Sequence, residues 1–238
     1  MRISRLLSGV YMATIFCVSA GLASAASYSF TGTLATDDQL QEFTFTLANT
    51  NVITAVTYGY AGGTNQAGTL IPEGGFDPAL AIFDSSGNLL ALNDDESTCS
   101  QVPGDSMTGA CLDSYLSESL GPGTYTLVLS QSGNDPIGNT LADGYLETGN
   151  PNYTAANGCS NGTFCDEFGD NRTGNFAVDI DNVTSASEVG AQAATPEPAT
   201  VLLSMAGLAG LTLLRRRSRA AQELAAECPK EEDSRESQ

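Results

Sequence analysis

The chain has 238 residues, with 28 Asp and Glu against 9 Lys and Arg, a formal charge of −19, and neither His nor Trp. This charge argues against binding to nucleic acid or to an anionic membrane surface, because both need clustered basic side chains. The absence of His excludes Ser-His-Asp and Cys-His hydrolase sites and His-ligated zinc or haem. An apolar content of 41% is too high for a disordered chain.

Residues 1–25 have the three parts of a secretory signal peptide. A start containing two Arg precedes a mostly apolar stretch at 6–22, and Ala23-Ser24-Ala25 is a small-x-small cleavage site. The alternative is an N-terminal anchor that is never cut, which the short apolar run disfavours. We therefore expect export and a mature chain that begins at Ala26.

The mature region contains several short runs with the period-2 alternation or the β-branched and aromatic content of strands. These runs lie at 43–47, 52–60, 80–82, 89–92, 115–120, 125–130 and 176–180. Turn residues occupy 84–88, and Gly121-Pro122-Gly123 is expected to join its two flanking strands as a hairpin. Asp179 and Asp181 alternate with apolar residues, so we expect them to face solvent.

The pattern predicts an all-β fold, a jelly-roll-like β-sandwich over residues 26–190, with no amphipathic helix. The Gly/Asn/Asp-rich segment 133–175 reads as a loop inserted into that sandwich. No internal repeat is evident.

Four cysteines remain in the mature domain, and an even number in an exported domain favours disulfides. Of the three possible pairings, we prefer the local one, Cys99 with Cys111 and Cys159 with Cys165, which closes two loops. A metal site is the alternative, but spacings of twelve and six do not resemble the close pairs of zinc sites.

The C-terminal region has three parts in a fixed order. A linker at 191–198 contains Pro196-Glu197-Pro198, an apolar segment follows at 199–214, and Arg215-Arg216-Arg217 begins a basic and then acidic tail at 215–238. Sixteen helical residues span about 24 Å, which is short of a typical ~30 Å hydrocarbon core. The arginines are expected to stay cytoplasmic.

This order resembles the PEP-CTERM sorting signal. The resemblance implies that an exosortase-type membrane enzyme recognises and processes the tail, so that the short helix holds the protein in the membrane only transiently. It also implies a Gram-negative-type bacterium that makes extracellular polysaccharide, with the protein in the cell envelope, at the cell surface or in the extracellular matrix.

The central segment resembles the bacterial pre-peptidase C-terminal (PPC) domain. An Asp-x-x-Leu strand begins at Asp77, a Gly-containing turn follows, an Asn-Asp-Asp cluster lies at 93–95, and a Gly-x-Tyr-x-Leu strand lies at 123–127. The resemblance covers roughly 28–182 and is strongest over 76–130. It implies a small, non-catalytic jelly-roll sandwich that accompanies secreted proteins and sometimes binds calcium.

Asn93-Asp94-Asp95-Glu96 is the densest group of side-chain oxygens. Alternation at a strand end would point the side chains of Asp94 and Glu96 to the same side. Ca²⁺ binds six to eight oxygen atoms, many of them from carboxylates. Asp77 and Asp113 flank this segment in the family pattern and are candidate further ligands. The alternative is a solvated turn whose acids serve solubility. A second acidic loop, 166–171, lacks the EF-hand spacing.

Residues 26–198 hold 22 acids and a single basic residue, Arg172, so any sandwich would bring two carboxylates together by chance. A carboxylate pair is therefore weak evidence for a glycosidase, and we expect no enzyme activity. We expect a structural or adhesive surface component associated with exopolysaccharide. The alternative is a calcium-dependent carbohydrate-binding module.

Overall fold

The computed structural model describes residues 25–96 and 98–190. The segments predicted as the signal peptide (1–25, except its last residue), the linker (191–198), the membrane helix (199–214) and the tail (215–238) lie outside the described residues. No helix among the described residues is long and apolar enough to cross a membrane.

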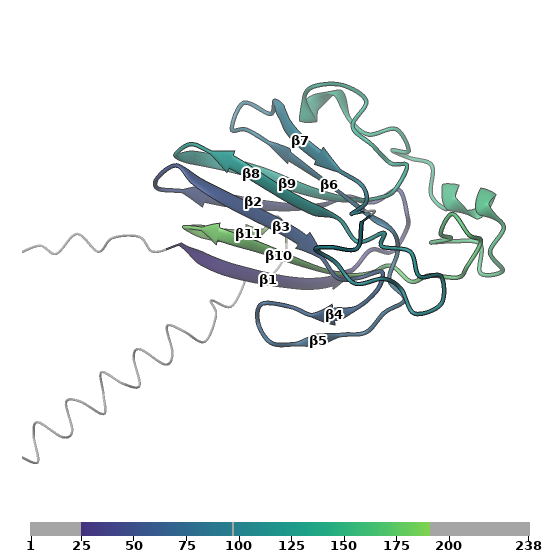
Figure 1. The fold of residues 1–238 in the computed structure, drawn as a ribbon. Helices are drawn as coiled ribbons and strands as arrows, with labels where there is room; N and C mark the ends of the chain where they lie inside the picture. Colours follow the sequence, from purple (N-terminus) through teal and green to yellow (C-terminus); the bar gives the residue numbers. More distant parts are fainter. Residues whose placement is uncertain (1–24, 97, 191–238) are drawn as a thin grey trace, which may run out of the picture.

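Eleven strands and two short 3₁₀ helices make up the described part of the chain (Figure 1). The strands are β1 (Ala26–Thr33), β2 (Gln41–Leu47), β3 (Asn51–Thr57), β4 (Gly63–Thr64), β5 (Leu70–Ile71), β6 (Pro78–Phe83), β7 (Leu89–Asn93), β8 (Tyr115–Leu120), β9 (Gly123–Gln131), β10 (Asn175–Val183) and β11 (Ser185–Glu188). The 3₁₀ helices are η1 (Leu141–Asp143) and η2 (Tyr153–Asn157).

Two antiparallel sheets pack face to face. One has the order β1-β10-β3-β8 and the other β11-β2-β9-β6-β7, while β4 and β5 form a separate two-stranded hairpin. If β4, β5 and β11 are left out and the other eight strands are numbered along the chain, these orders become 1-8-3-6 and 2-7-4-5. This is the jelly-roll arrangement, and the predicted all-β sandwich is confirmed.

The core lies between the two sheets and is filled by the residues whose alternation predicted the strands. Phe43, Phe45 and Leu47 of β2 are buried, whereas Thr44 and Thr46 between them are only partly buried. Phe43 packs against Phe30 of β1 with ring centroids 4.8 Å apart, which joins the two sheets. Buried aliphatic side chains from β3, β6, β9 and β10 complete this layer.

The expected hairpin between residues 115 and 130 is wrong. β8 pairs with β3 in the first sheet, while β9 pairs with β2 and β6 in the second, so the chain crosses the sandwich at Gly121 and Pro122. Tyr125 stabilises the crossing, because its hydroxyl donates to the carbonyl of Gly121 at 2.9 Å and its ring stacks on Phe45. Strands that face each other across a core show the same alternation as strands that pair, so the pattern does not separate the two cases.

The expectation that Asp179 and Asp181 face solvent is also wrong, because both side chains are buried. They lie on the face of β10 that points away from the core, and residues of the β4–β5 hairpin cover them. The backbone N–H of Gln66 donates to Asp179 at 2.8 Å, and the hydroxyl of Ser29 donates to the same carboxylate. Burial raises the pKa of Asp179.

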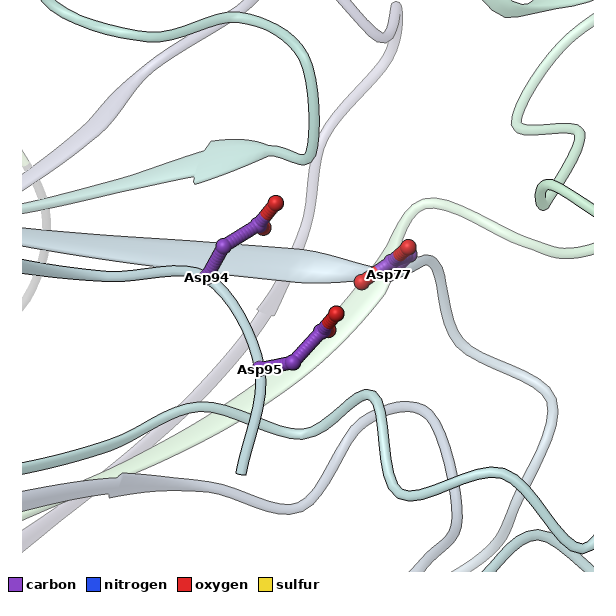
Figure 2. A group of neighbouring side chains, drawn as sticks. All are labelled: Asp77, Asp94 and Asp95. Atoms are coloured by element: carbon purple, nitrogen blue, oxygen red, sulfur yellow. The ribbon is translucent and has the colours of Figure 1, made fainter. Parts of the chain in front are cut away.

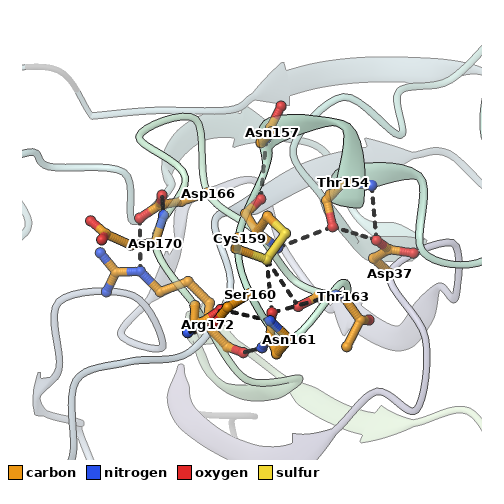
Figure 3. The surroundings of a disulfide bond; sticks show 12 residues. Asp37, Thr154, Asn157, Cys159, Ser160, Asn161, Thr163, Asp166, Asp170 and Arg172 are labelled. Carbon is orange, nitrogen blue, oxygen red and sulfur yellow. Dashed lines mark hydrogen bonds and ion pairs between the residues drawn. A yellow bond between two sulfur atoms is a disulfide. The ribbon is translucent and has the colours of Figure 1, made fainter.

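Both disulfides follow the local pairing, Cys99 with Cys111 and Cys159 with Cys165. The second closes part of the inserted segment between β9 and β10, which carries η1 and η2 (Figure 1). Figure 3 shows how Asp37, far away in sequence, holds this insertion: its carboxylate accepts hydrogen bonds from the N–H and hydroxyl of Thr154. The hydroxyl of Thr154 in turn accepts from the N–H of Cys165 at 3.1 Å.

Candidate metal centre

Three of the predicted acidic residues lie together at one end of the β6–β7 hairpin. Asp77 directly precedes β6, and Asp94 and Asp95 directly follow β7. One carboxylate oxygen from each residue lies within 4.8 Å of those of the other two. Figure 2 shows Asp95 pointing toward Asp77, with Asp94 beside them.

Antiparallel pairing explains why these residues meet. Leu80 of β6 lies opposite Asn93 of β7, so the start of one strand and the end of the other share an edge. β7 ends at Asn93, and the expected alternation does not continue beyond it. Asp94 and Asp95 therefore both approach Asp77, instead of pointing to opposite sides.

Two oxygens of this group are buried without any hydrogen-bond donor: Oδ1 of Asp77 and Oδ1 of Asp94. Asp77 is only 6% exposed. The second oxygen of Asp94 accepts from the hydroxyl of Ser132 at 2.9 Å, which fixes the orientation of that carboxylate. Buried polar atoms are nearly always paired in folded proteins, so these two oxygens require an explanation.

Burial and repulsion from nearby carboxylates raise the pKa of all three carboxyl groups. Burial is the largest cause in each case, and it places the pKa of Asp77 well above its usual range and that of Asp95 at about 6. Asp94 adds repulsion at both Asp77 and Asp95, and Glu167 adds repulsion at all three. Without a counterion, this group is therefore costly to keep fully ionised.

The structure does not bring Glu96 into this group. Its carboxylate accepts from the N–H of Ser100 at 2.7 Å, from the N–H of Gln101 at 3.2 Å and from the hydroxyl of Thr98. The hydrogen bond from Thr98 is the largest cause of a lowered pKa. Glu96 thus organises the start of the loop that Cys99 and Cys111 close.

Asp113 also lies outside the group and is completely buried. Its carboxylate accepts from the hydroxyl of Thr57 at 2.9 Å and from the N–H groups of Tyr60 at 3.2 Å and Ala61 at 2.9 Å. These bonds fix the turn that follows β3. Burial raises the pKa of Asp113, while the three hydrogen bonds oppose that rise.

A cleft of about 350 Å³ lies beside Asp77. Its lining includes Asp77, Gln131, Glu147, Tyr153 and Glu167. The amide oxygen of Gln131 is buried and has no hydrogen-bond partner, like Oδ1 of Asp77. Glu167 belongs to the second acidic loop, 166–171, but its place beside Asp77 has no signal in the sequence, and no local pattern marks Gln131.

In the second acidic loop, the carboxylate of Asp166 is occupied by the protein itself. One oxygen accepts from the N–H groups of Phe168 and Asp170, and the other accepts from Arg172 at 2.8 Å and from the hydroxyl of Tyr60. Figure 3 shows Asp166 and Arg172 beside the second disulfide. This arrangement builds a turn and leaves Asp166 no free lone pair directed at a cation.

The donor set around Asp77 is made of oxygen atoms, which suits a hard cation. Oxygens bound to one Ca²⁺ at 2.3–2.6 Å are at most about 5 Å apart, so the spacing within 4.8 Å fits such an ion. All four cysteines of the described residues are in disulfides, so none of them is available as a thiolate ligand for a softer metal. Asp77, Asp94 and Asp95 are the residues best placed to hold a metal.

Residues 194–217, beyond the described part of the chain, match the PEP-CTERM protein-sorting motif. The match contains Pro196-Glu197-Pro198 and Arg215-Arg216-Arg217, the residues predicted as the sorting signal. It indicates an exported bacterial protein of the cell envelope or surface, processed by an exosortase-type membrane enzyme. No curated protein matches the chain. The β-rich fold is compatible with a PPC-like domain, and that assignment stays a prediction.

Proposed function

We propose that this exosortase-sorted protein is a non-catalytic structural or adhesive component of the bacterial cell surface or extracellular matrix, associated with exopolysaccharide. The observation that carries the proposal is the combination of a sorting motif at 194–217 with a disulfide-closed, strongly acidic sandwich. Two disulfides suit a domain that works outside the cell, where thiols are oxidised.

The buried acids outside the three-aspartate group support a structural reading. Five of these carboxylates accept hydrogen bonds from backbone or side-chain donors of neighbouring loops: those of Asp37, Asp105, Asp113, Asp166 and Asp179. Carboxylates used in this way hold the connections of the sandwich together. A general acid or base would need a carboxylate directed at a substrate.

The sorting step can be tested in the native host by fractionating cells that express the full chain. We expect the protein in the surface or matrix fraction, and its retention in the membrane when Pro196, Glu197 and Pro198 are replaced by Ala. Replacement of Glu231, Glu232 and Asp233 by Ala is the matched control, because it changes three residues behind the motif. Identical fractionation of both variants would refute exosortase sorting through this motif.

The surface role needs a second experiment. Cells that lack the protein should retain less polysaccharide matrix or adhere less, and the full chain should restore the defect. Hydrolysis of the host's exopolysaccharide by the purified protein would contradict a non-catalytic role.

A calcium-dependent carbohydrate-binding module is the second candidate. The cleft beside Asp77 favours it, because polar side chains such as Gln131 and Tyr153 line a space of about 350 Å³. A glycan array or a polysaccharide pull-down, run with Ca²⁺ and with chelator, distinguishes the two candidates. Calcium-dependent glycan binding supports the module, whereas surface retention without glycan binding supports the structural component.

A further inference from the structure

We propose that Asp77, Asp94 and Asp95 bind one Ca²⁺ ion and that Glu167 supplies a fourth carboxylate, so that the ion clamps the inserted loop onto the ends of β6 and β7. This site goes beyond the proposed surface role and does not depend on it. It assigns a ligand class to the group and a structural consequence to its binding.

The unpartnered oxygen of Asp77 is the first support. Asp77 is only 6% exposed, its Oδ1 accepts no hydrogen bond, and the carboxylates of Asp94 and Asp95 lie beside it. Oδ1 of Asp94 is in the same state. A solvated turn would leave its carboxylates in contact with water, whereas a cation supplies the missing partner for both oxygens at once.

Charge around the site is the second support. Arg172 is the only basic side chain among the described residues, and it is buried against Asp105 and Asp166. Within 25–96 and 98–190, no other basic side chain is therefore available to neutralise Asp77, Asp94 and Asp95. Glu147 and Glu167 add further negative charge along the neighbouring cleft.

The position of Glu167 connects the site to the inserted loop. Asp166, its neighbour, is bonded to Arg172 at 2.8 Å, and the N–H of Gly169 donates to the carbonyl of Asp166 in a tight turn. Glu167 lines the same cleft as Asp77 and acts electrostatically on all three aspartates. An ion held between Glu167 and the aspartates would join segments that are about 70 to 90 residues apart in sequence.

The test uses the purified, oxidised full chain and CaCl₂. Isothermal titration calorimetry should show one Ca²⁺ per chain, and Ca²⁺ at about 100 times its Kd should raise Tm by roughly 5–10 °C. Asp95→Asn should abolish binding, and Glu167→Gln should weaken it about tenfold or more. Glu188→Gln is the matched control, because Glu188 lies on β11, at the opposite edge of the sheet from β7.

Two further readouts separate a metal site from a merely structural cluster. In chelator, Asp95→Asn should melt higher than the wild type, because it removes repulsion, and the order should reverse in Ca²⁺. Hydrogen exchange should slow in peptides covering 93–96 and 166–171 when Ca²⁺ is added.

Several results would overturn the proposal. One is a titration with CaCl₂ up to 5 mM that releases or absorbs no heat and leaves Tm unchanged. The others are an unchanged Ca²⁺ affinity in Asp95→Asn and an affinity for Mg²⁺ equal to that for Ca²⁺. Ca²⁺ binding that does not slow hydrogen exchange in residues 166–171 would show that the ion does not clamp the inserted loop. None of these measurements depends on sorting or on matrix retention. A negative result for Ca²⁺ therefore does not contradict the proposed surface role.

Discussion

The guanidinium carbon of Arg172 lies 4.0 Å from the centroid of the Tyr60 ring. The same guanidinium donates to the hydroxyl of Tyr60 at 2.8 Å, to Asp105 at 3.0 Å and to Asp166 at 2.8 Å. Asp105 lies within the loop closed by Cys99 and Cys111, and Asp166 follows Cys165 directly. One side chain therefore ties both disulfide loops to the turn after β3.

Arg172→Met should be strongly destabilising. It leaves the buried carboxylates of Asp105 and Asp166 without their cation, and breaking a buried pair in this way costs about 3–5 kcal/mol. For a domain of this size, that corresponds to a fall in Tm of roughly 6–20 °C, measurable by circular dichroism. Arg172→Lys should lower Tm less, because Lys keeps the positive charge although it lacks the planar guanidinium with its several N–H donors. Equal stability of Arg172→Met and wild type would show that the network contributes nothing.

The first disulfide and Arg172 should be energetically coupled. Replacing Cys99 and Cys111 by Ser should cost about 2–4 kcal/mol. Because the opened loop no longer holds Asp105 in place, adding Arg172→Met should then cost less than it does in the wild type, by about 0.5–3 kcal/mol. A double-mutant cycle in urea measures this coupling. Strict additivity would mean that Asp105 keeps its position without the disulfide.

Tyr125→Phe should weaken the connection between the two sheets. The change removes the hydroxyl that donates to Gly121 and keeps the ring stacked on Phe45. We expect a loss of about 1 kcal/mol in the free energy of unfolding. Tyr28→Phe is the control, because its hydroxyl bond to Thr184 is longer, at 3.3 Å. A larger loss for Tyr28→Phe would contradict this account.

Asp179 should make the stability depend on pH. Burial raises its pKa, hydrogen bonds from Ser29, Gln66 and Tyr58 oppose the rise, and the charge of Asp181 adds to it. An acid whose pKa is higher in the folded state binds more protons there, so its contribution makes stability fall as pH rises from about 4 through the folded-state pKa. Asp179→Asn should flatten this slope.

This pH dependence is measured as Tm between pH 4.5 and 7.5 in chelator, so that no metal takes part. Glu118→Gln, on an edge strand of the same sheet, should keep the slope of the wild type. An unchanged slope in Asp179→Asn would show that the carboxyl titrates normally in the folded protein.

The strands and their buried faces could be predicted from the sequence, because the alternation of apolar and polar residues shows which side chains become buried. The pairing of Cys99 with Cys111 followed from local spacing. The proximity of Asp77 to Asp94 and Asp95 has an equally local origin, since these residues flank the two strands of one hairpin.

Other features depend on contacts that no local pattern encodes. Whether β8 and β9 pair or face each other is decided by the whole strand order, and Asp179 is buried because a distant hairpin covers it. Glu167 lines the same cleft as Asp77, although it belongs to the inserted segment and lies 90 positions further along the chain. Arg172 gave a clear signal as the single basic residue, but its partners are 6, 67 and 112 positions away.

The burial of Arg172 leaves the surface of the described residues without a cationic side chain. Two copies of this domain would therefore meet as like-charged particles whichever faces they present. In 0.01 M salt the repulsion extends over about 30 Å, and at physiological ionic strength over about 8 Å. On a crowded bacterial surface, the spacing of neighbouring copies would thus follow the salinity and the divalent cations of the surrounding water.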